Sequence, residues 1–347
     1  MRHVAMLPSL LTLGNFTCGL LSVVVCASSL HFHGLARQND RYAALLAEGM
    51  AAEPGVDADA DADVRARRGF GGVGRFRPAS FPDRLDPETL RRFGQAMRER
   101  SRELFVYAGL LVFIGMFFDM LDGRVARMTQ SESRFGAELD SLADICTFGV
   151  APAVMTATLW LMAHPPQASW YGQVLFFAAV YAACAALRLA RYNVEIGGAD
   201  KNWFRGLPSP AAAGCVASAA LFCYADGYLD GFWRWCSAQA GGRMNPEEVL
   251  ARAVALYALA VGFLMVTRLG FVHVMNRYYR GRKKFTTLVL IVFLLVLLME
   301  FPWIMLFAAF NGYVAACLAA NAWARRKAPP WRRAAPPRDP AAPGAEP

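Results

Sequence analysis

Long uncharged stretches recur along this chain and constrain its fold more than any other feature. An α-helix needs roughly 20 apolar residues to cross a ~30 Å hydrocarbon core. Apolar stretches near that length occupy residues 10–30, 104–121, 142–163, 170–190, 210–225, 253–272, 286–301 and 304–323. Unpaired backbone polar groups are costly in lipid, so such segments fold as helices. We therefore expect an all-α polytopic membrane protein with about eight spans.

The overall composition agrees with a membrane protein. Of 347 residues, 56% are apolar and only 18% are charged, which is too little charge for a chain that mostly faces water. The net charge of +9 is compatible with nucleic acid, but the basic residues lie in loops between apolar stretches, where anionic lipid headgroups are nearer. We expect membrane lipids as partners and no nucleic acid.

Lys and Arg near the span ends predict the orientation. With a cytoplasmic N-terminus, the outside loops 164–169 and 302–303 have no Lys or Arg and the outside loop 226–252 has three, while the outside loop 34–103 is too long for the rule to apply. The inside loops and the C-terminal tail are then basic, with residues such as Arg124, Arg188 and Arg325. Because basic loops stay inside, both termini are expected in the cytoplasm.

Shifts in composition divide the chain into five segments. We expect a first span in 1–33, a low-complexity insertion ending in an interfacial helix in 34–103, a transmembrane core in 104–272, two additional spans in 273–323 and a disordered basic Pro-rich tail in 324–347.

Two patterns inside the insertion resemble ligand loops but lack their key residues. The run DADADAD at Asp57–Asp63 has neither the Gly nor the Glu of a calcium loop, and the Gly-rich stretch Phe70–Phe76 has no GK[ST] ending. Both are expected to be solvated coil. The interfacial helix is predicted from Asp86-Pro87 onward, because Pro favours a helix start and an apolar face follows it.

Four aspartates lie where the second predicted span ends and the third begins, in the segment DMLDGRVARMTQSESRFGAELDSLAD (119–144). Helical spacing places one set on one helix face, namely Asp119, Asp122, Gly123 and Ala126, and a second set on the next helix, namely Gly136, Asp140 and Asp144. Converging carboxylates repel one another unless cations lie between them. Oxygen ligands suit hard metals, so we expect two Mg²⁺ or Mn²⁺ ions. Interfacial charge or helix packing explains any one of these residues alone, but not the set.

The set matches the pattern D-x2-D-G-x2-A-R-x8-G-x3-D-x3-D at every position, and so resembles the signature of the CDP-alcohol phosphotransferase family. The resemblance implies an integral membrane enzyme with a six-helix core, here followed by two C-terminal helices. It also implies that Asp119, Asp122, Asp140 and Asp144 bind the metals and that Asp144 is the catalytic general base. Four residues would line the cytidine diphosphate pocket: Gly123, Ala126, Arg127 and Gly136.

Other segments resemble the CDP-diacylglycerol–serine O-phosphatidyltransferases of this family, namely 8–22, 140–153, 186–194 and 204–214. This resemblance implies CDP-diacylglycerol and L-serine as substrates, phosphatidylserine and CMP as products, and a bacterial inner membrane with the active site facing the cytoplasm. We also expect a homodimer. The alternatives are another acceptor, glycerol 3-phosphate or an inositol phosphate, and, from a different class, a metal or proton transporter.

Three further polar residues are candidates for substrate contact. Arg188 and Arg191 suit bidentate binding of the donor phosphate or the serine carboxylate, or they only anchor the helix end on the inside. Asn15, in the first span with Thr12, contacts the nucleotide or hydrogen-bonds across helices.

Overall fold

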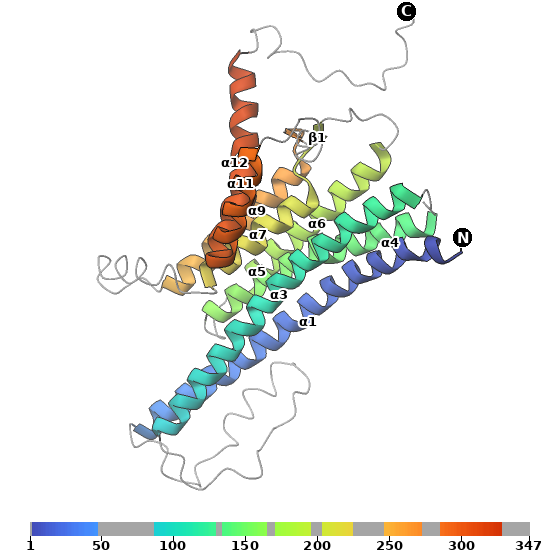
Figure 1. Cartoon of the computed structure of the whole chain (residues 1–347). Helices are drawn as coiled ribbons and strands as arrows, with labels where there is room; N and C mark the ends of the chain where they lie inside the picture. The colour runs from blue at the N-terminus through green and yellow to red at the C-terminus, as the bar shows by residue number, and fades with distance from the viewer. Residues whose placement is uncertain are drawn as a thin grey trace, which may run out of the picture. The chain divides into compact units, whose positions relative to one another are not determined.

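The computed structural model describes residues 2–47, 87–129, 134–164, 171–195, 203–224, 246–272 and 285–327. Most of these residues are helical (Figure 1). The helices are α1 (Arg2–Ala47), α3 (Pro87–Thr129), α4 (Arg134–Asp144), the π-helical turn η1 (Ile145–Val150), α5 (Ala151–Ala163), α6 (Tyr171–Glu195), α7 (Ser209–Tyr224), α9 (Pro246–Val266), α11 (Phe285–Glu300) and α12 (Pro302–Lys327).

Six helical segments are long and apolar enough to cross a membrane: Pro8–Ala44, Pro87–Ala126, Phe135–Ala163, Gly172–Val194, Glu247–Val266 and Pro302–Trp323. The predicted all-α polytopic membrane fold is thereby confirmed. The helix α7 is apolar but shorter. Of the two additional C-terminal spans, α12 meets the length requirement, whereas α11 has 16 residues and stays a predicted span.

The central element of the transmembrane part is the continuous helical segment formed by α4, η1 and α5. In its most apolar window 78% of the residues are buried within the protein, against at most 39% in the other five candidate spans. The helix α5 is apolar on all sides, from Pro152 in its first turn to Trp160 near its end, and it packs against α6, α7 and α9. A helix that is hydrophobic all round belongs in a core, so α5 forms the centre on which α6, α7 and α9 pack.

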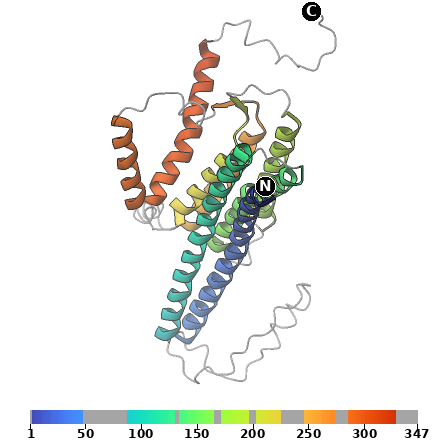
Figure 2. The ribbon, with the colours of Figure 1, turned by 45° about the vertical axis from the view of Figure 1, so that its right-hand side comes forward.

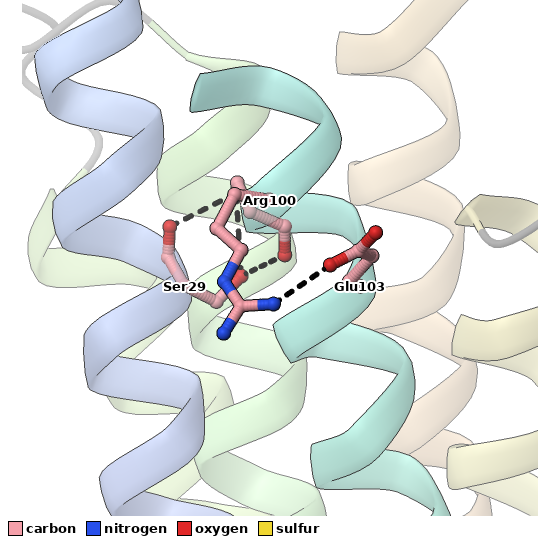
Figure 3. A network of polar contacts seen from close by, with 4 residues as sticks. Ser29, Arg100 and Glu103 are labelled. Carbon is pink, nitrogen blue, oxygen red and sulfur yellow. Dashed lines mark hydrogen bonds and ion pairs between the residues drawn. The ribbon is translucent and has the colours of Figure 1, made fainter. Parts of the chain in front are cut away.

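The chain divides into two compact units, Met1–Cys26 with Phe105–Pro347, and Ala27–Leu104. In the second unit, the C-terminal half of α1 runs beside the N-terminal half of α3 (Figures 1 and 2). Ser29 Oγ donates to the Ser101 carbonyl at 2.6 Å and Ser101 Oγ donates to the Ser29 carbonyl at 2.9 Å (Figure 3). Asp40 forms an ion pair with Arg98 nearer the ends of the two helices.

These two helices are longer than the predicted spans. At 1.5 Å per residue, the 46 residues of α1 extend about 69 Å, more than twice a ~30 Å hydrocarbon core. The helix α1 continues to Ala47, inside the predicted insertion, and the expected interfacial helix is the first part of α3 rather than a separate element. The helix α3 begins at Pro87 as predicted. The Asp-rich run, the Gly-rich stretch and the tail after Lys327 lie outside the described residues.

A short pair of strands, absent from the sequence prediction, joins the segment before α7 to the segment after α9. Strand β1 (Trp203–Arg205) pairs antiparallel with β2 (Gly270–Val272), with Phe204 opposite Phe271. Gly206 follows with φ +83°, and a Cβ there would lie 2.3 Å from the Met265 carbonyl oxygen. Three-residue strands have too little pattern to be seen in a sequence, because neighbouring helices rather than local propensity decide them.

Candidate metal and nucleotide site

The C-terminal end of α3 and the helix α4 carry the motif. Asp119 and Asp122 lie in the last turns of α3, while Asp140 and Asp144 lie in the second half of α4. Asp144 is the last residue of α4, and its backbone stays helical where η1 begins (φ −61°, ψ −43°). Because all four aspartates lie on helical backbone, their carboxylates have fixed directions, which a loop would not give them.

Three of the four carboxylates form one cluster. Asp119, Asp140 and Asp144 each offer an oxygen, and these oxygens lie within 4.8 Å of one another. Asp122 is not a member of this trio, but it is buried at 5% exposure and interacts electrostatically with Asp140. Such a concentration of negative charge requires a cation or protons to balance it.

The donor set fits a hard divalent cation. Among the described residues, Asp122 Oδ2 and Asp140 Oδ1 are buried and have no hydrogen-bond partner. A buried oxygen without a partner is costly, and a metal ion would relieve that cost. Carboxylate oxygens alone, with no thiolate or imidazole in the cluster, are the ligands typical of Mg²⁺ or Mn²⁺.

The small residues of the motif lie on the same two helices as the cluster. Gly123 is exposed, and a Cβ added there would meet nothing within 4 Å. Ala126 on α3 and Gly136 on α4 are half-buried. Open space at Gly123 is compatible with a ligand lying against the helix, as the sequence predicted. Arg127 lies on α3, but its side chain is outside the described part of the chain.

The first helix contributes to the same site. Asn15 is fully buried, and its Nδ2 lies 3.5 Å from Asp144 Oδ1, at the limit of a hydrogen bond. Thr12, one turn earlier, is buried beside Asp122. The sequence predicted nucleotide contact or a hydrogen bond across helices for Asn15; the structure places its Nδ2 within reach of Asp144 on another helix, and the nucleotide contact stays a prediction.

The two arginines of α6 have different surroundings. Arg188 is buried, its Nη1 donates to Ser209 Oγ at 2.9 Å, and its Nε has no partner among the described residues. It interacts electrostatically with Asp144. Arg191 is half-buried, and its Nη1 donates to the Val266 carbonyl at 2.9 Å, at the end of α9. Arg188 is therefore near enough to Asp144 to interact with it electrostatically, whereas Arg191 binds a helix terminus.

Several contacts around the site were not predicted from the sequence. Ser209 accepts a hydrogen bond from Arg188, and Asn193, which the sequence places beside the two arginines, donates to Ser141 Oγ at 3.1 Å and joins α6 to α4. Thr147 in η1 donates to the Asn15 carbonyl at 2.9 Å. Small polar residues in apolar spans are the available signal, since such residues often bond across helices, but their partners cannot be read from spacing.

Comparisons with known proteins agree with the motif. Residues 92–241 match the family described as CDP-alcohol phosphatidyltransferase, and this range includes all eight motif positions. The matched range also includes α4, η1, α5, α6 and α7, that is, the central helical segment, the helix with both arginines and the helix with Ser209.

Several curated relatives are named CDP-diacylglycerol–serine O-phosphatidyltransferase. One from Helicobacter pylori is 39% identical over 128 residues, which is 37% of this chain and 51% of the relative. One from Saccharomyces cerevisiae is 36% identical over 35% of this chain and 44% of the relative. One from Bacillus subtilis is 38% identical over 31% of this chain and 57% of the relative. The chain thus spans about half the length of these relatives, and the similarity to the CDP-alcohol phosphatidyltransferase family is established for residues 92–241.

Proposed function

We propose that this protein transfers the phosphatidyl group of CDP-diacylglycerol to L-serine, giving phosphatidylserine and CMP. The observation that carries the proposal is the carboxylate cluster of Asp119, Asp140 and Asp144, which lies inside the segment matching the family. The names of the relatives from Helicobacter pylori, Saccharomyces cerevisiae and Bacillus subtilis support serine as the acceptor.

The proposed metal ligands are Asp119, Asp122, Asp140 and Asp144, holding two Mg²⁺ or Mn²⁺ ions. The unpartnered buried oxygens of Asp122 and Asp140 support this assignment. Bound there, divalent metal supplies positive charge that neutralises the pyrophosphate of the donor. The second ion is proposed because four carboxylates carry more negative charge than one divalent cation balances.

Asp144 is the proposed general base. A serine hydroxyl is a weak nucleophile at neutral pH, so a carboxylate must take its proton as the new bond forms. The serine oxygen then bonds to the lipid-side phosphorus. The bond from that phosphorus to the bridging oxygen breaks, and CMP leaves with that oxygen on its own phosphate. Asn15 Nδ2, 3.5 Å from Asp144 Oδ1, would help to orient the accepting carboxylate.

The remaining motif residues are proposed to bind the substrates. Gly123, Ala126, Arg127 and Gly136 would line the cytidine diphosphate pocket, because a nucleotide can approach helix backbone closely where side chains are small. Asn15 is also proposed to contact the nucleotide. The Arg188 guanidinium keeps donors beyond the one given to Ser209 and would bind the donor phosphate or the serine carboxylate. Arg191, whose Nη1 bonds to Val266, is the second candidate.

The proposal places the protein in a bacterial inner membrane with its site facing the cytoplasm. The basic residues Arg325, Arg326 and Lys327 at the end of α12 support an inside C-terminus. We also propose that the protein forms a homodimer. Crosslinking in native membranes tests this, and recovery of the monomer alone would refute the dimer.

The direct test of the acceptor is CMP release. Purified protein in mixed micelles with CDP-diacylglycerol and Mn²⁺ receives L-serine, glycerol 3-phosphate, an inositol phosphate or no acceptor. We expect serine to exceed the others at least about tenfold, because its carboxylate and ammonium both offer charge-assisted bonds. A clear preference for glycerol 3-phosphate would refute serine but keep the reaction class. No release with any alcohol would refute the reaction itself.

A further inference from the structure

The turn that follows Asp144 differs from the rest of its helix. Residues Ile145–Val150 form a π-helical turn, inserted between α4 and α5 without a break in the helical backbone. Short π-helical insertions are uncommon and often occur at functional sites. Thr147, in the middle of this turn, is fully buried. What Thr147 contacts is therefore relevant to how Asp144 is held.

Thr147 connects the turn to the first helix by a hydrogen bond. Its Oγ1 donates to the backbone carbonyl of Asn15 at 2.9 Å. The side chain of Asn15 makes a second contact, because its Nδ2 lies 3.5 Å from Asp144 Oδ1. Asn15 thus meets η1 with its backbone and the end of α4 with its side chain, so any shift of α1 against η1 changes the second contact.

Two glycines make this close approach possible. A Cβ added to Gly19, on α1, would lie 2.6 Å from Thr147 Oγ1, and a Cβ added to Gly115, on α3, would lie 2.6 Å from Thr147 Cγ2. Both distances are far below ordinary van der Waals contact. The Thr147 side chain therefore fills a notch that two different helices leave open, with its hydroxyl toward α1 and its methyl toward α3.

We propose that Thr147 is a positioning residue, which fixes α1 and α3 against η1 so that Asn15 holds the Asp144 carboxylate in register with Asp119 and Asp140. The inference deepens the proposed function, because it rests on Asp144 acting in that site. Its basis is one side chain at the junction of the three helices that supply Asn15, Asp119 and Asp144. The Thr147 hydroxyl donates the hydrogen bond to Asn15, and its methyl group occupies the space left by Gly115.

The first test replaces the hydroxyl without changing the shape. Thr147→Val removes the donor and keeps both branches, whereas Thr147→Ser keeps the donor. We expect Thr147→Val to weaken Mn²⁺ binding, measured by electron paramagnetic resonance, and to lower kcat for CMP release, each about tenfold, the size of effect expected from losing one buried hydrogen bond. Thr147→Ser should stay within about twofold of the wild type in both.

The matched control is Thr156→Val. Thr156 is also buried, and its Oγ1 donates to the Pro152 carbonyl within α5 at 2.9 Å. Its loss should leave Mn²⁺ affinity unchanged. If Thr147→Val lowers only the melting temperature, as Thr156→Val could, and Mn²⁺ affinity and kcat stay within twofold of the wild type, the positioning role is refuted.

The second test uses the notch. Gly115→Ala should damage Mn²⁺ binding, and the double variant Gly115→Ala/Thr147→Ser should recover it in part, because serine lacks Cγ2 while the added Cβ still lies 3.0 Å from Asn15 Oδ1. Gly19→Ala/Thr147→Ser should not recover, since the added Cβ also lies 2.9 Å from the Thr147 backbone nitrogen and 3.0 Å from its Cα. Equal recovery of both pairs, or of neither, would contradict the proposed contacts.

The two proposals fail in different ways. A wild-type protein that binds Mn²⁺ but releases no CMP with any acceptor would refute the proposed function, and the Mn²⁺ measurements on the variants would still decide the role of Thr147. A wild-type protein that releases CMP from serine, with variants that all behave alike, would refute the role of Thr147 alone.

Discussion

Replacing Asp144 with asparagine is the sharpest perturbation of the proposed site. The substitution keeps the size of the side chain and one oxygen ligand, but it removes a negative charge and the proton acceptor. Oxygens of Asp144, Asp119 and Asp140 lie within 4.8 Å of one another. At an effective dielectric constant of 20, each ionised pair at that distance repels by about 3.5 kcal/mol. Neutralising Asp144 therefore relieves two repulsions in the metal-free protein while it weakens attraction for a cation.

We expect two opposite effects from Asp144→Asn. Turnover, assayed as CMP release from CDP-diacylglycerol with serine, should fall by about 10²–10⁴-fold, the usual contribution of a positioned general base. The melting temperature of the metal-free protein should rise or stay the same, and its increase on adding Mn²⁺ should shrink. Binding of CDP-diacylglycerol should remain detectable, because the other ligands are intact.

The matched control is Asp40→Asn, which also neutralises an aspartate, one paired with Arg98 away from the motif. Its turnover should stay close to that of the wild type. Asp144→Asn activity above about a tenth of the wild type would refute the general-base assignment. A large loss of stability in the metal-free Asp144→Asn protein would refute the electrostatic reasoning about the cluster.

Three further predictions concern metal, the insertion and the strand pair. Chelation should abolish CMP release, and Mn²⁺ or Mg²⁺ should restore it. The same should hold after all eight cysteines are replaced by Ala or Ser, and a cysteine-free variant whose activity the metal no longer restores would contradict oxygen ligation. A Gly/Ser linker in place of residues 48–86 should leave an inserted, active protein, as measured by protease accessibility and CMP release, because every motif position lies elsewhere; an inserted but inactive protein would show that the segment helps to build the site. Gly206→Ala should lower the melting temperature, since alanine strains a φ of +83° and its Cβ would lie 2.3 Å from the Met265 carbonyl; an unchanged melting temperature would contradict the importance of this turn.

The sequence predicted the features that depend on local pattern. The apolar stretches predicted the membrane helices. The spacing from Asp119 to Asp144 predicted two helix faces that bring carboxylates together, and the close approach of the Asp119, Asp140 and Asp144 oxygens confirms this arrangement. Their roles as ligands and base stay predictions. Spacing is informative here because helical periodicity converts it directly into direction.

Other features depend on contacts between distant segments. The helix α1 continues to Ala47, beyond its apolar stretch, and in this part Asp40 forms an ion pair with Arg98 of α3, a pair that no local rule predicts. The π-helical turn that places Thr147 against Asn15 has the same origin. It requires the space left by Gly19 and Gly115, 128 and 32 residues earlier in the chain.

The most direct test of the central claim follows the acceptor into the lipid. Purified protein in liposomes with CDP-diacylglycerol and Mn²⁺ is incubated with isotopically labelled L-serine, and the extracted lipids and released CMP are quantified by mass spectrometry. We predict labelled phosphatidylserine, one molecule for each CMP, and neither product from Asp119→Ala. Release of CMP without label in the lipid would contradict transfer to serine.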